Sequence, residues 1–357
     1  MREVTAVVWQ LDKCHYGVNL LRRITTRSTV FMKLIAPLLI ALVSITALAQ
    51  DRQVRLDALR AEGYAALYNL DYETARNRFQ KMIDLAPDDP AGPQCMASSL
   101  WVQQLNQSWE LKATLYSTGA YTDSKSPVDR KQADEFRKWI RRAKQLSQAR
   151  LRKDPHDVEA LYFLGAAEGL EASFAAGVER RFMAAFRAGS DSVDHHREVL
   201  KLAPDFHDAE LTIGLMNYIV GSLPLPTKML VATMGVRGSK KRGLEALERV
   251  ATQGKWARDV ARVLLVDLYK REKRWEDAKR TALELAAKYP RNYLFKLQAA
   301  DALASQIVEL RKAKKPSSVE EKELQDMFTS LLRDKSFDAP TRELVNVRWN
   351  IARKQLQ

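Results

Sequence analysis

The sequence predicts an all-α protein, a tetratricopeptide-like α-solenoid of antiparallel helix pairs with lengthened, irregular middle repeats. Three observations predict it. Leu and Ala dominate the aliphatic residues while Gly (14) and Pro (12) are few among 357 residues, a balance that favours helices over strands. Apolar residues recur at helical spacing in successive segments. Prolines recur just after these segments, where they end a helix.

The N-terminal region has the features of a signal peptide. Met32-Lys33 precedes an apolar run over 34–49, which ends in Ala47-Leu48-Ala49, a small-x-small cleavage pattern. The run is shorter than the roughly 20 residues of a membrane span. We expect translation to start at Met32, with 1–31 a mis-assigned upstream segment. The alternative is that these residues form a long charged region before the apolar run.

This assignment predicts a signal peptide over 32–49 and export after cleavage near Ala49–Gln50. Cys95 is the one cysteine that follows, so no internal disulfide is possible. Export without disulfides fits a bacterial periplasm, with secretion as the other possibility. The protein carries a net charge of +14. Export argues against nucleic acid as the partner, and leaves an anionic membrane leaflet, lipopolysaccharide, an acidic partner or merely a solvated basic surface.

The segment 59–90 reads as two short helices joined by a tight turn near Asn69-Leu70-Asp71. Its small residues allow the two helices to approach closely, and an aromatic residue fills the space beside them. This pattern resembles the tetratricopeptide repeat, with Leu59 standing where a larger aromatic residue is typical. The matching positions are Gly63, Tyr72, Ala75, Phe79 and Pro87.

An offset of twelve between a small residue and a closing proline recurs along the chain. The pairs are Ala75 and Pro87, Ala143 and Pro155, Ser192 and Pro204, and Ala278 and Pro290. Gly165 is a further expected packing position. The best second copy is 256–290, in which Trp275 opens the second helix. The resemblance implies a non-catalytic protein-binding fold.

The middle units are longer than the repeat. We expect two long helices over about 94–115 and 131–153, joined by a loop over 117–130, and a helix pair broken near 187–192. The aromatic residues Trp101, Trp109, Tyr116 and Tyr121 fall on this region and are expected to pack in the core, the alternative being anchors at an interface.

A hairpin that begins at residue 207 has a delayed second helix, which starts near Ser239. Repeats are expected over 50–300, followed by a C-terminal helical cap over 301–357 with an interruption at 314–321. An end repeat has no neighbour to cover its apolar face, so a cap is needed there.

Residues 210–300 also resemble the tetratricopeptide repeat protein thirty-nine family. The family pattern runs from Leu-Pro through an apolar segment to Gly-x-x-Gly, a charged pair and Gly-Leu. It falls on Leu223, Pro224, Gly235, Gly238, Lys240, Lys241, Gly243 and Leu244. Lys240 stands where the family often has an acidic residue. The resemblance implies a non-catalytic adaptor.

The stretch "GVRGSKKRGLEAL", 235–247, raises the question of a phosphate loop. Its glycine spacing is too short for a P-loop, and no Ser or Thr follows the lysines. Ser239 instead suits the N-cap of a helix. Cations in a first turn oppose the helix dipole, which leaves contact with an anion or an acidic partner as the alternative. The candidate contacts are Arg237, Lys240, Lys241 and Arg242.

The apolar segment 223–236 is expected to be a helix buried against its own repeats, and the alternative is an element on a membrane surface.

His195-His196 does not form a metal motif, and we expect these histidines to be solvated. Cys95 is expected to be a packed, unreactive thiol. We predict no catalytic residue, no cofactor and no metal.

The sequence therefore predicts a scaffold or adaptor that binds a protein or peptide on the concave face of the solenoid, where the first helix of each pair lines the inner surface. An acidic ligand would suit the cations at 240–242. The alternative is a peripheral protein of the membrane that uses 223–242.

Overall fold

The computed structural model describes residues 50–107, 130–233 and 235–356. The chain divides into two compact units, residues 1–58 and 59–357. Of the first unit, residues 50–58 are described and are helical. The expected signal peptide and most of the expected 117–130 loop lie outside the described residues. The rest of this account concerns the second unit.

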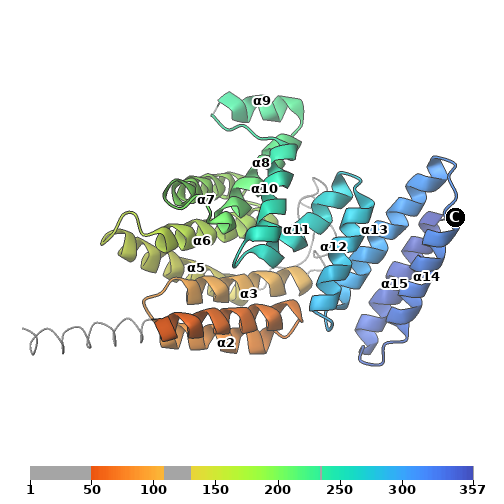
Figure 1. Ribbon diagram of the computed structural model, residues 1–357, viewed down its shortest axis with the longest axis horizontal. Helices are drawn as coiled ribbons and strands as arrows, with labels where there is room; N and C mark the ends of the chain where they lie inside the picture. Colours follow the sequence, from red (N-terminus) through yellow and green to blue (C-terminus); the bar gives the residue numbers. More distant parts are fainter. Residues whose placement is uncertain (1–49, 108–129, 234, 357) are drawn as a thin grey trace, which may run out of the picture. The chain divides into compact units, whose positions relative to one another are not determined.

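The described residues of this unit form helices and turns with no strand, which confirms the all-α prediction (Figure 1). A helix ends at residue 68, and the others follow it in order. They are α2 (Tyr72–Leu85), α3 (Ala91–Gln107), α5 (Arg130–Leu151), α6 (Val158–Gly177), α7 (Phe182–Leu202), η1 (His207–Ala209), α8 (Glu210–Ser222), α9 (Leu225–Thr233), α10 (Lys240–Gln253), α11 (Arg258–Arg271), α12 (Trp275–Lys288), α13 (Tyr293–Lys312), α14 (Ser318–Leu332) and α15 (Ala339–Leu356).

In the first hairpin, Gly63 faces the Phe79 ring. A Cβ placed on Gly63 would come within 2.3 Å of Phe79 Cε1, so only glycine allows this approach. Asp71 caps α2 by accepting from the backbone N–H of Thr74 at 3.2 Å. Leu70 takes a positive φ of 65° in the turn. The tight turn therefore brings the two helices together over a ring that fills the gap.

The helices α2, α5, α7 and α12 end shortly before Pro87, Pro155, Pro204 and Pro290. The small residues that precede these prolines by twelve positions are fully buried between helices: Ala75, Ala143, Ser192 and Ala278. Trp275 begins α12 and is half-buried, and Tyr72 begins α2 in the same way. Small residues let neighbouring helices approach closely, and the prolines turn the chain into the next hairpin.

One expected helix boundary is wrong. The predicted break at 187–192 lies inside the continuous helix α7, and the turn instead falls at 178–181. The small residues there are packing positions, because a Cβ on Gly189 would come within 2.8 Å of Met216 Cε. The predicted boundary at 301 lies inside α13. The C-terminal helices α13, α14 and α15 share one apolar cluster around Phe328.

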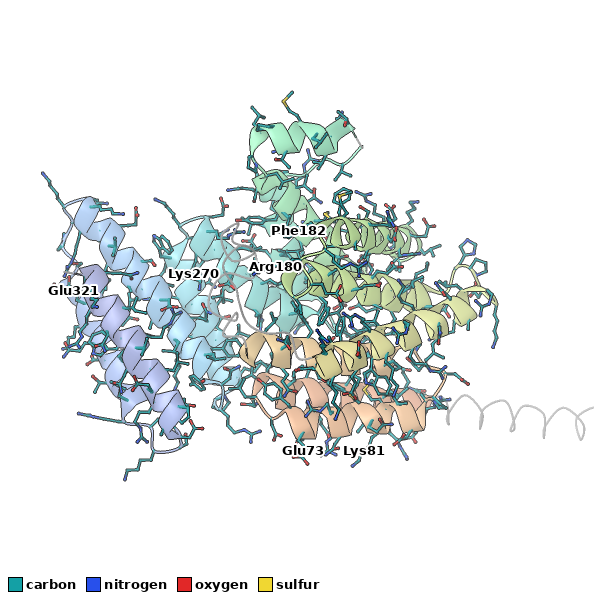
Figure 2. The ribbon with its side chains drawn as sticks, turned by 180° about the vertical axis from the view of Figure 1, so that it is seen from behind. Glu73, Lys81, Arg180, Phe182, Lys270 and Glu321 are labelled. Carbon is teal, nitrogen blue, oxygen red and sulfur yellow. The ribbon has the colours of Figure 1, made fainter. Side chains whose placement is uncertain are left out.

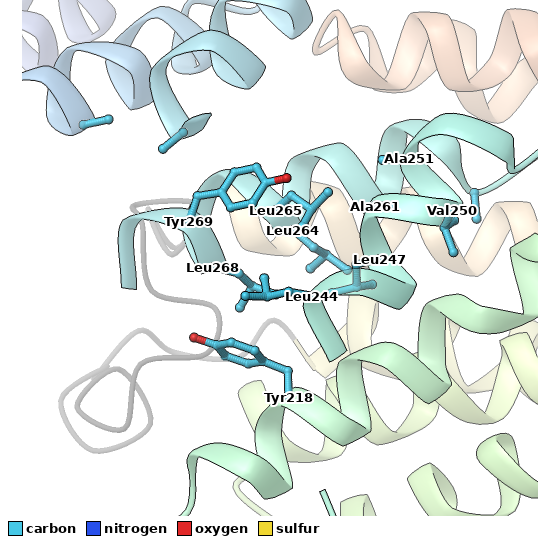
Figure 3. Packing of buried hydrophobic residues seen from close by; sticks show 13 residues of the cluster. Tyr218, Leu244, Leu247, Val250, Ala251, Ala261, Leu264, Leu265, Leu268 and Tyr269 are labelled. Carbon is cyan, nitrogen blue, oxygen red and sulfur yellow. The ribbon is translucent and has the colours of Figure 1, made fainter. Parts of the chain in front are cut away.

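The helices α8, α10 and α11 share a second apolar cluster, which Figure 3 shows in close-up. Tyr218 from α8, Leu247 from α10 and Leu268 from α11 are buried there. As expected, Ser239 caps α10 through the backbone N–H of Arg242, at 3.4 Å. The delayed second helix of this hairpin is therefore α10, and α9 is an insertion between the two.

The expectation that 223–236 is buried is wrong, because α9 contains no buried residue. Figure 1 shows α9 at the top, beyond the ends of α8 and α10. Two glycines bring the base of this insertion together, since a Cβ on Gly238 would lie 2.6 Å from the backbone N of Gly221. The two backbone segments at the base of the insertion therefore lie in direct contact. We call this contact between Gly221 and Gly238 the neck of the insertion.

The first hairpin also contacts the turn between α12 and α13, more than 200 residues away in sequence. The side-chain amide of Asn292 donates to the carbonyl oxygen of Tyr68 at 2.7 Å. The Arg291 N–H donates to Asn69 Oδ1 at 3.1 Å, and the rings of Tyr68 and Tyr289 are 5.1 Å apart. In the array of helix pairs from residue 59 to α13, the last part therefore contacts the first helix.

Candidate functional site

The inner faces of these helix pairs enclose a pocket of about 210 Å³. Its walls come almost entirely from the first helix of each pair, as the sequence predicts for a solenoid. These are the helix that ends at residue 68, then α3, α6, α8, α11 and α13. The side chains on which the argument depends are Arg60, Tyr64, Cys95, Tyr162, Phe163, Ala166, His196, Asp208 and Trp256. Most of the wall is apolar or aromatic.

One wall of the pocket is a group of stacked rings around a buried cation. Trp256 stacks on Phe163 with centroids 5.4 Å apart and lies 5.4 Å from Tyr162. The guanidinium of Arg60 lies 4.1 Å from the Trp256 centroid and 5.2 Å from that of Phe163. Arg60 is buried, so this cation–π contact is shielded from water and correspondingly strong. The group presents a flat aromatic surface beside a positive charge.

Trp256 is held in place by Asp208. The buried Asp208 carboxylate accepts from the backbone N–H groups of Lys255, Trp256 and Ala257, at 2.9, 2.8 and 2.6 Å. These groups precede α11 and would otherwise lack partners, so the carboxylate acts as a cap from a distant element. The indole Nε1 of Trp256 is buried and has no hydrogen-bond partner among the described residues.

Cys95 and His196, two titratable groups of the pocket, are held in their neutral forms. Burial raises the pKa of the Cys95 thiol to about 11, so the thiol stays protonated, as the packed-thiol prediction expects. Burial lowers the pKa of His196 to about 4. His196 Nε2–H donates to the Tyr162 carbonyl at 3.1 Å and Nδ1 accepts from the Thr212 hydroxyl. Both ring nitrogens are therefore occupied in a neutral ring.

The expectation of solvated histidines is wrong for His196, which is 1% exposed. Gly165 explains the position of the ring, since a Cβ there would come within 2.8 Å of His196 Cδ2. His195 is partly buried and donates to Glu168 at 2.8 Å, a bond that raises its pKa. The neighbouring histidines thus face different surroundings, because adjacent helix positions point in different directions.

The predicted basic contacts lie on the neck of the α9 insertion and the first turn of α10. Lys240 pairs with Glu272 at 2.7 Å, and Glu272 also accepts from the Tyr218 hydroxyl at 2.7 Å. This acid offsets the cation that opposes the helix dipole. Arg237, Lys241 and Arg242 are exposed. The predicted cations do not line the pocket described above.

The glycines of the 235–247 stretch are packing positions. A Cβ on Gly243 would come within 2.7 Å of the Gly214 carbonyl oxygen on α8. Gly238 meets the backbone of Gly221 in the same way, while Gly235 has a positive φ of 80°. The stretch is the start of a helix that lies close against α8, and its glycines are explained by packing rather than by a phosphate loop.

The sequence analysis did not identify Arg60 and Trp256 as residues of the pocket. Arg60 lies on a helix with many charged neighbours, and Trp256 lies in a turn, so no local pattern distinguishes them. Trp101 is buried in the core as expected, whereas Trp109, Tyr116 and Tyr121 lie outside the described residues.

The described part of the chain contains no group of three His, Cys, Asp or Glu side chains placed to hold a metal. Nor does any helix in it have the length and apolar character to span a membrane.

Comparison with protein-family models gives no match, and neither does comparison with curated proteins. Solved structures to which this chain shows similarity include two helical-repeat proteins. One is TTC0263, a thermophilic TPR protein of Thermus thermophilus, with 15% identity, a TM-score of 0.38, and coverage of 71% of this chain and 98% of that one. The other is a monomeric mutant of IFIT1 with Gppp-AAAA, with 13% identity, a TM-score of 0.37, and coverage of 84% of this chain but only 64% of that one.

Proposed function

We propose that this protein is a non-catalytic helical-repeat scaffold that binds a peptide or protein segment in the pocket between its first helices. The observation that carries the proposal is the pocket itself, which collects the inner faces of six helices around one aromatic wall. Concave, mostly apolar pockets with a few placed polar groups are typical binding sites.

The pocket favours a segment with an apolar or aromatic side chain next to a carboxylate or carbonyl group. The apolar group would stack on Trp256 and Phe163, as aromatic anchors do at hot spots. An acceptor would satisfy the buried Trp256 Nε1 and would lie near the charge of Arg60. The neutral Cys95 and His196 fit binding better than nucleophilic or acid–base catalysis.

We further propose that the scaffold acts in the bacterial envelope after removal of the signal peptide. The support is the apolar run over 34–49 with its small-x-small ending, together with a single later cysteine, Cys95. The ligand is then a periplasmic protein or peptide rather than a nucleic acid.

The test is to fill the pocket without removing a packing contact. Ala166 lines the pocket and is half-buried, so Ala166→Phe places a ring in the empty volume. Peptides selected from a display library on the wild-type protein are measured by calorimetry against both proteins. We expect the variant to lose at least about tenfold in affinity, or ~1.4 kcal/mol. The matched control is Ala313→Phe, an exposed alanine outside the pocket, which should bind as the wild type does.

Thermal unfolding of both variants checks that they fold. The proposal is contradicted if the library yields no binder, or if Ala166→Phe binds as well as Ala313→Phe does. A selected set without apolar residues would overturn the proposed ligand chemistry.

A further inference from the structure

The α9 insertion exposes apolar side chains that nothing in the described protein covers. Leu225, Met229 and Leu230 are 71%, 63% and 65% exposed, and every described residue of α9 is exposed or half-buried. Isolated exposed apolar residues are ordinary, but three large ones on a nine-residue helix are not. The helix needs an apolar environment that the described residues do not supply.

A second exposed apolar pair lies at the same end of the molecule. Phe182 and Met183 begin α7 and are 54% and 70% exposed (Phe182 is labelled in Figure 2). The helices α7 and α8 are antiparallel, because His196 pairs with Thr212 while Gly189, about two turns earlier on α7, meets Met216, which lies further along α8. The start of α7 and the end of α8 therefore lie together, and α9 follows the end of α8 by two residues.

Cations predominate around this apolar group, although Lys240 pairs with Glu272 and Lys241 lies 3.9 Å from Glu245. The sequence has no Asp or Glu from Leu211 to Leu244, although the whole chain has 44 such residues. Lys228 lies on α9, and its Nζ donates to the Gly221 carbonyl at 3.3 Å. Arg237, Lys241 and Arg242 are exposed on the neck and on the start of α10. This charge pattern complements a negatively charged surface.

We infer that the α9 insertion, residues 223–242, together with Phe182 and Met183, attaches the protein to an anionic lipid surface. The apolar side chains enter the headgroup region and the cations pair with lipid phosphates. Leu225 and Met229 lie about one turn apart on one side of α9, and Leu230 lies next to Met229 around the helix. Anionic lipid is the occupant that the surrounding cations favour over an apolar protein groove.

The test uses a label on α9 itself, in the full chain. Met229→Cys carries an environment-sensitive fluorophore in a Cys14→Ser background, and Cys95 is buried and stays unlabelled. The control is Val319→Cys, a site on α14 that is 75% exposed. Residues 1–49 are common to both proteins, so any membrane affinity of their own cannot distinguish the two labels.

With vesicles of phosphatidylcholine and phosphatidylglycerol, the label at position 229 should shift to the blue and brighten, and the label at 319 should not. Vesicles of phosphatidylcholine alone should give a much smaller change. Absence of a shift at 229 with anionic vesicles overturns the inference. So does an equal shift with neutral vesicles, because the cations then have no role. A shift without vesicles that grows with protein concentration assigns the surface to a second copy instead, and a shift with an acidic protein but not with vesicles assigns it to such a partner.

Matched variants separate charge from apolar contact. Replacing Arg237, Lys241 and Arg242 by Gln should weaken binding to anionic vesicles by about fivefold for each cation removed. The same change at Lys312, Lys314 and Lys315, three exposed cations elsewhere, should have little effect. Leu225→Ser with Met229→Ser and Leu230→Ser should weaken binding at least about tenfold. Equal loss in the two charge variants contradicts a site at α9. Peptide binding in the pocket should persist in all of them, so the two proposals fail separately.

Discussion

The side-chain amide of Asn292, just before α13, donates a hydrogen bond of 2.7 Å to the carbonyl oxygen of Tyr68 at the end of the first helix. The same side chain caps α13, since its Oδ1 accepts from the Leu294 N–H at 3.1 Å. The buried side chain of Asn292 thus bonds a carbonyl at the end of the first helix and caps the start of α13. It joins two segments that are 224 residues apart in sequence. This contact sets the distance between the two ends of the helix array around the pocket.

Replacing Asn292 by Ala should lower the free energy of unfolding by about 1–3 kcal/mol, because the Tyr68 carbonyl loses its partner in a buried position and α13 loses its cap. Urea unfolding measures the change. Asn350→Ala is the control, since Asn350 is exposed and bonds only the nearby Arg353 among the described residues. Equal stability of the two variants would show that the contact does not join the segments.

Gly63→Ala should destabilise the first hairpin by about 1–3 kcal/mol, because the added methyl group meets the Phe79 ring at 2.3 Å. A double-mutant cycle with Phe79→Leu tests the cause. The alanine should cost clearly less in the Phe79→Leu background, since the smaller side chain leaves room for it. Additive effects would place the cost elsewhere than in this contact.

His196 should make the protein less stable in mild acid. Its folded pKa is about 4 against 6.5 for an ordinary histidine, so the unfolded state binds more protons below pH 6.5. The stability is complete above that pH and falls between 6.5 and 4, by at most about 3 kcal/mol. His195 acts in the opposite direction, because Glu168 raises its pKa and favours the folded state while it is protonated.

The two contributions can be separated by variants. His196→Gln should reduce the loss of stability between about pH 7 and about pH 5 in urea titrations. His195→Gln should increase that loss, because it removes the histidine whose protonation helps folding. The same pH dependence in His196→Gln and wild type would show that another group dominates.

Asp208→Ala should have two effects, because the carboxylate both caps α11 and holds Trp256. We expect a loss of about 2–4 kcal/mol in stability, in the range of broken buried hydrogen-bond networks. Peptide affinity should fall as well, with a change in tryptophan emission. Asp205→Ala, at an exposed carboxylate three residues away, should change neither quantity. Peptide affinity that survives in a folded Asp208→Ala protein would show that the position of Trp256 is unimportant.

The mature protein should begin at Gln50 when the full-length gene is expressed in a bacterium with a periplasm. Intact mass and N-terminal sequencing of the exported protein measure this. Ala49→Pro should block cleavage and leave a longer, membrane-bound precursor, because the peptidase needs a small residue at that position. Recovery of an uncleaved wild-type protein from the cytoplasm would contradict the export proposal.

Much of the fold can be predicted from the sequence because it depends on local chemistry. Gly63 with Phe79, Ser239 as a cap, and the prolines after α2, α5, α7 and α12 act within a single hairpin, and all three appear where their spacing places them. The errors occur where a long-range contact gives a small residue another use. Gly189 reads as a break, but Met216 from α8 makes it a packing position.

The pocket was predicted in outline only. Repeat geometry places the first helices on the inner face, but it does not say which of their side chains converge. Arg60, Asp208 and Trp256 come from three separate elements, and they meet because the array returns to its start at Asn292. The burial of the α9 insertion was predicted wrongly for a related reason. Apolar composition predicts burial, but here the neck formed by Gly221 and Gly238 leads the helix away from its neighbours.

The bond between Asn292 and Tyr68 also bears on how such a chain can change in evolution. An open array tolerates duplication or loss of a hairpin, because each pair touches only its neighbours. Here an extra hairpin between residue 68 and Asn292 would move the two partners apart and open the pocket. Growth by tandem duplication is thus confined to the C-terminal side of α13, and variation elsewhere must proceed by lengthening helices or by insertions that point outward, as α9 does.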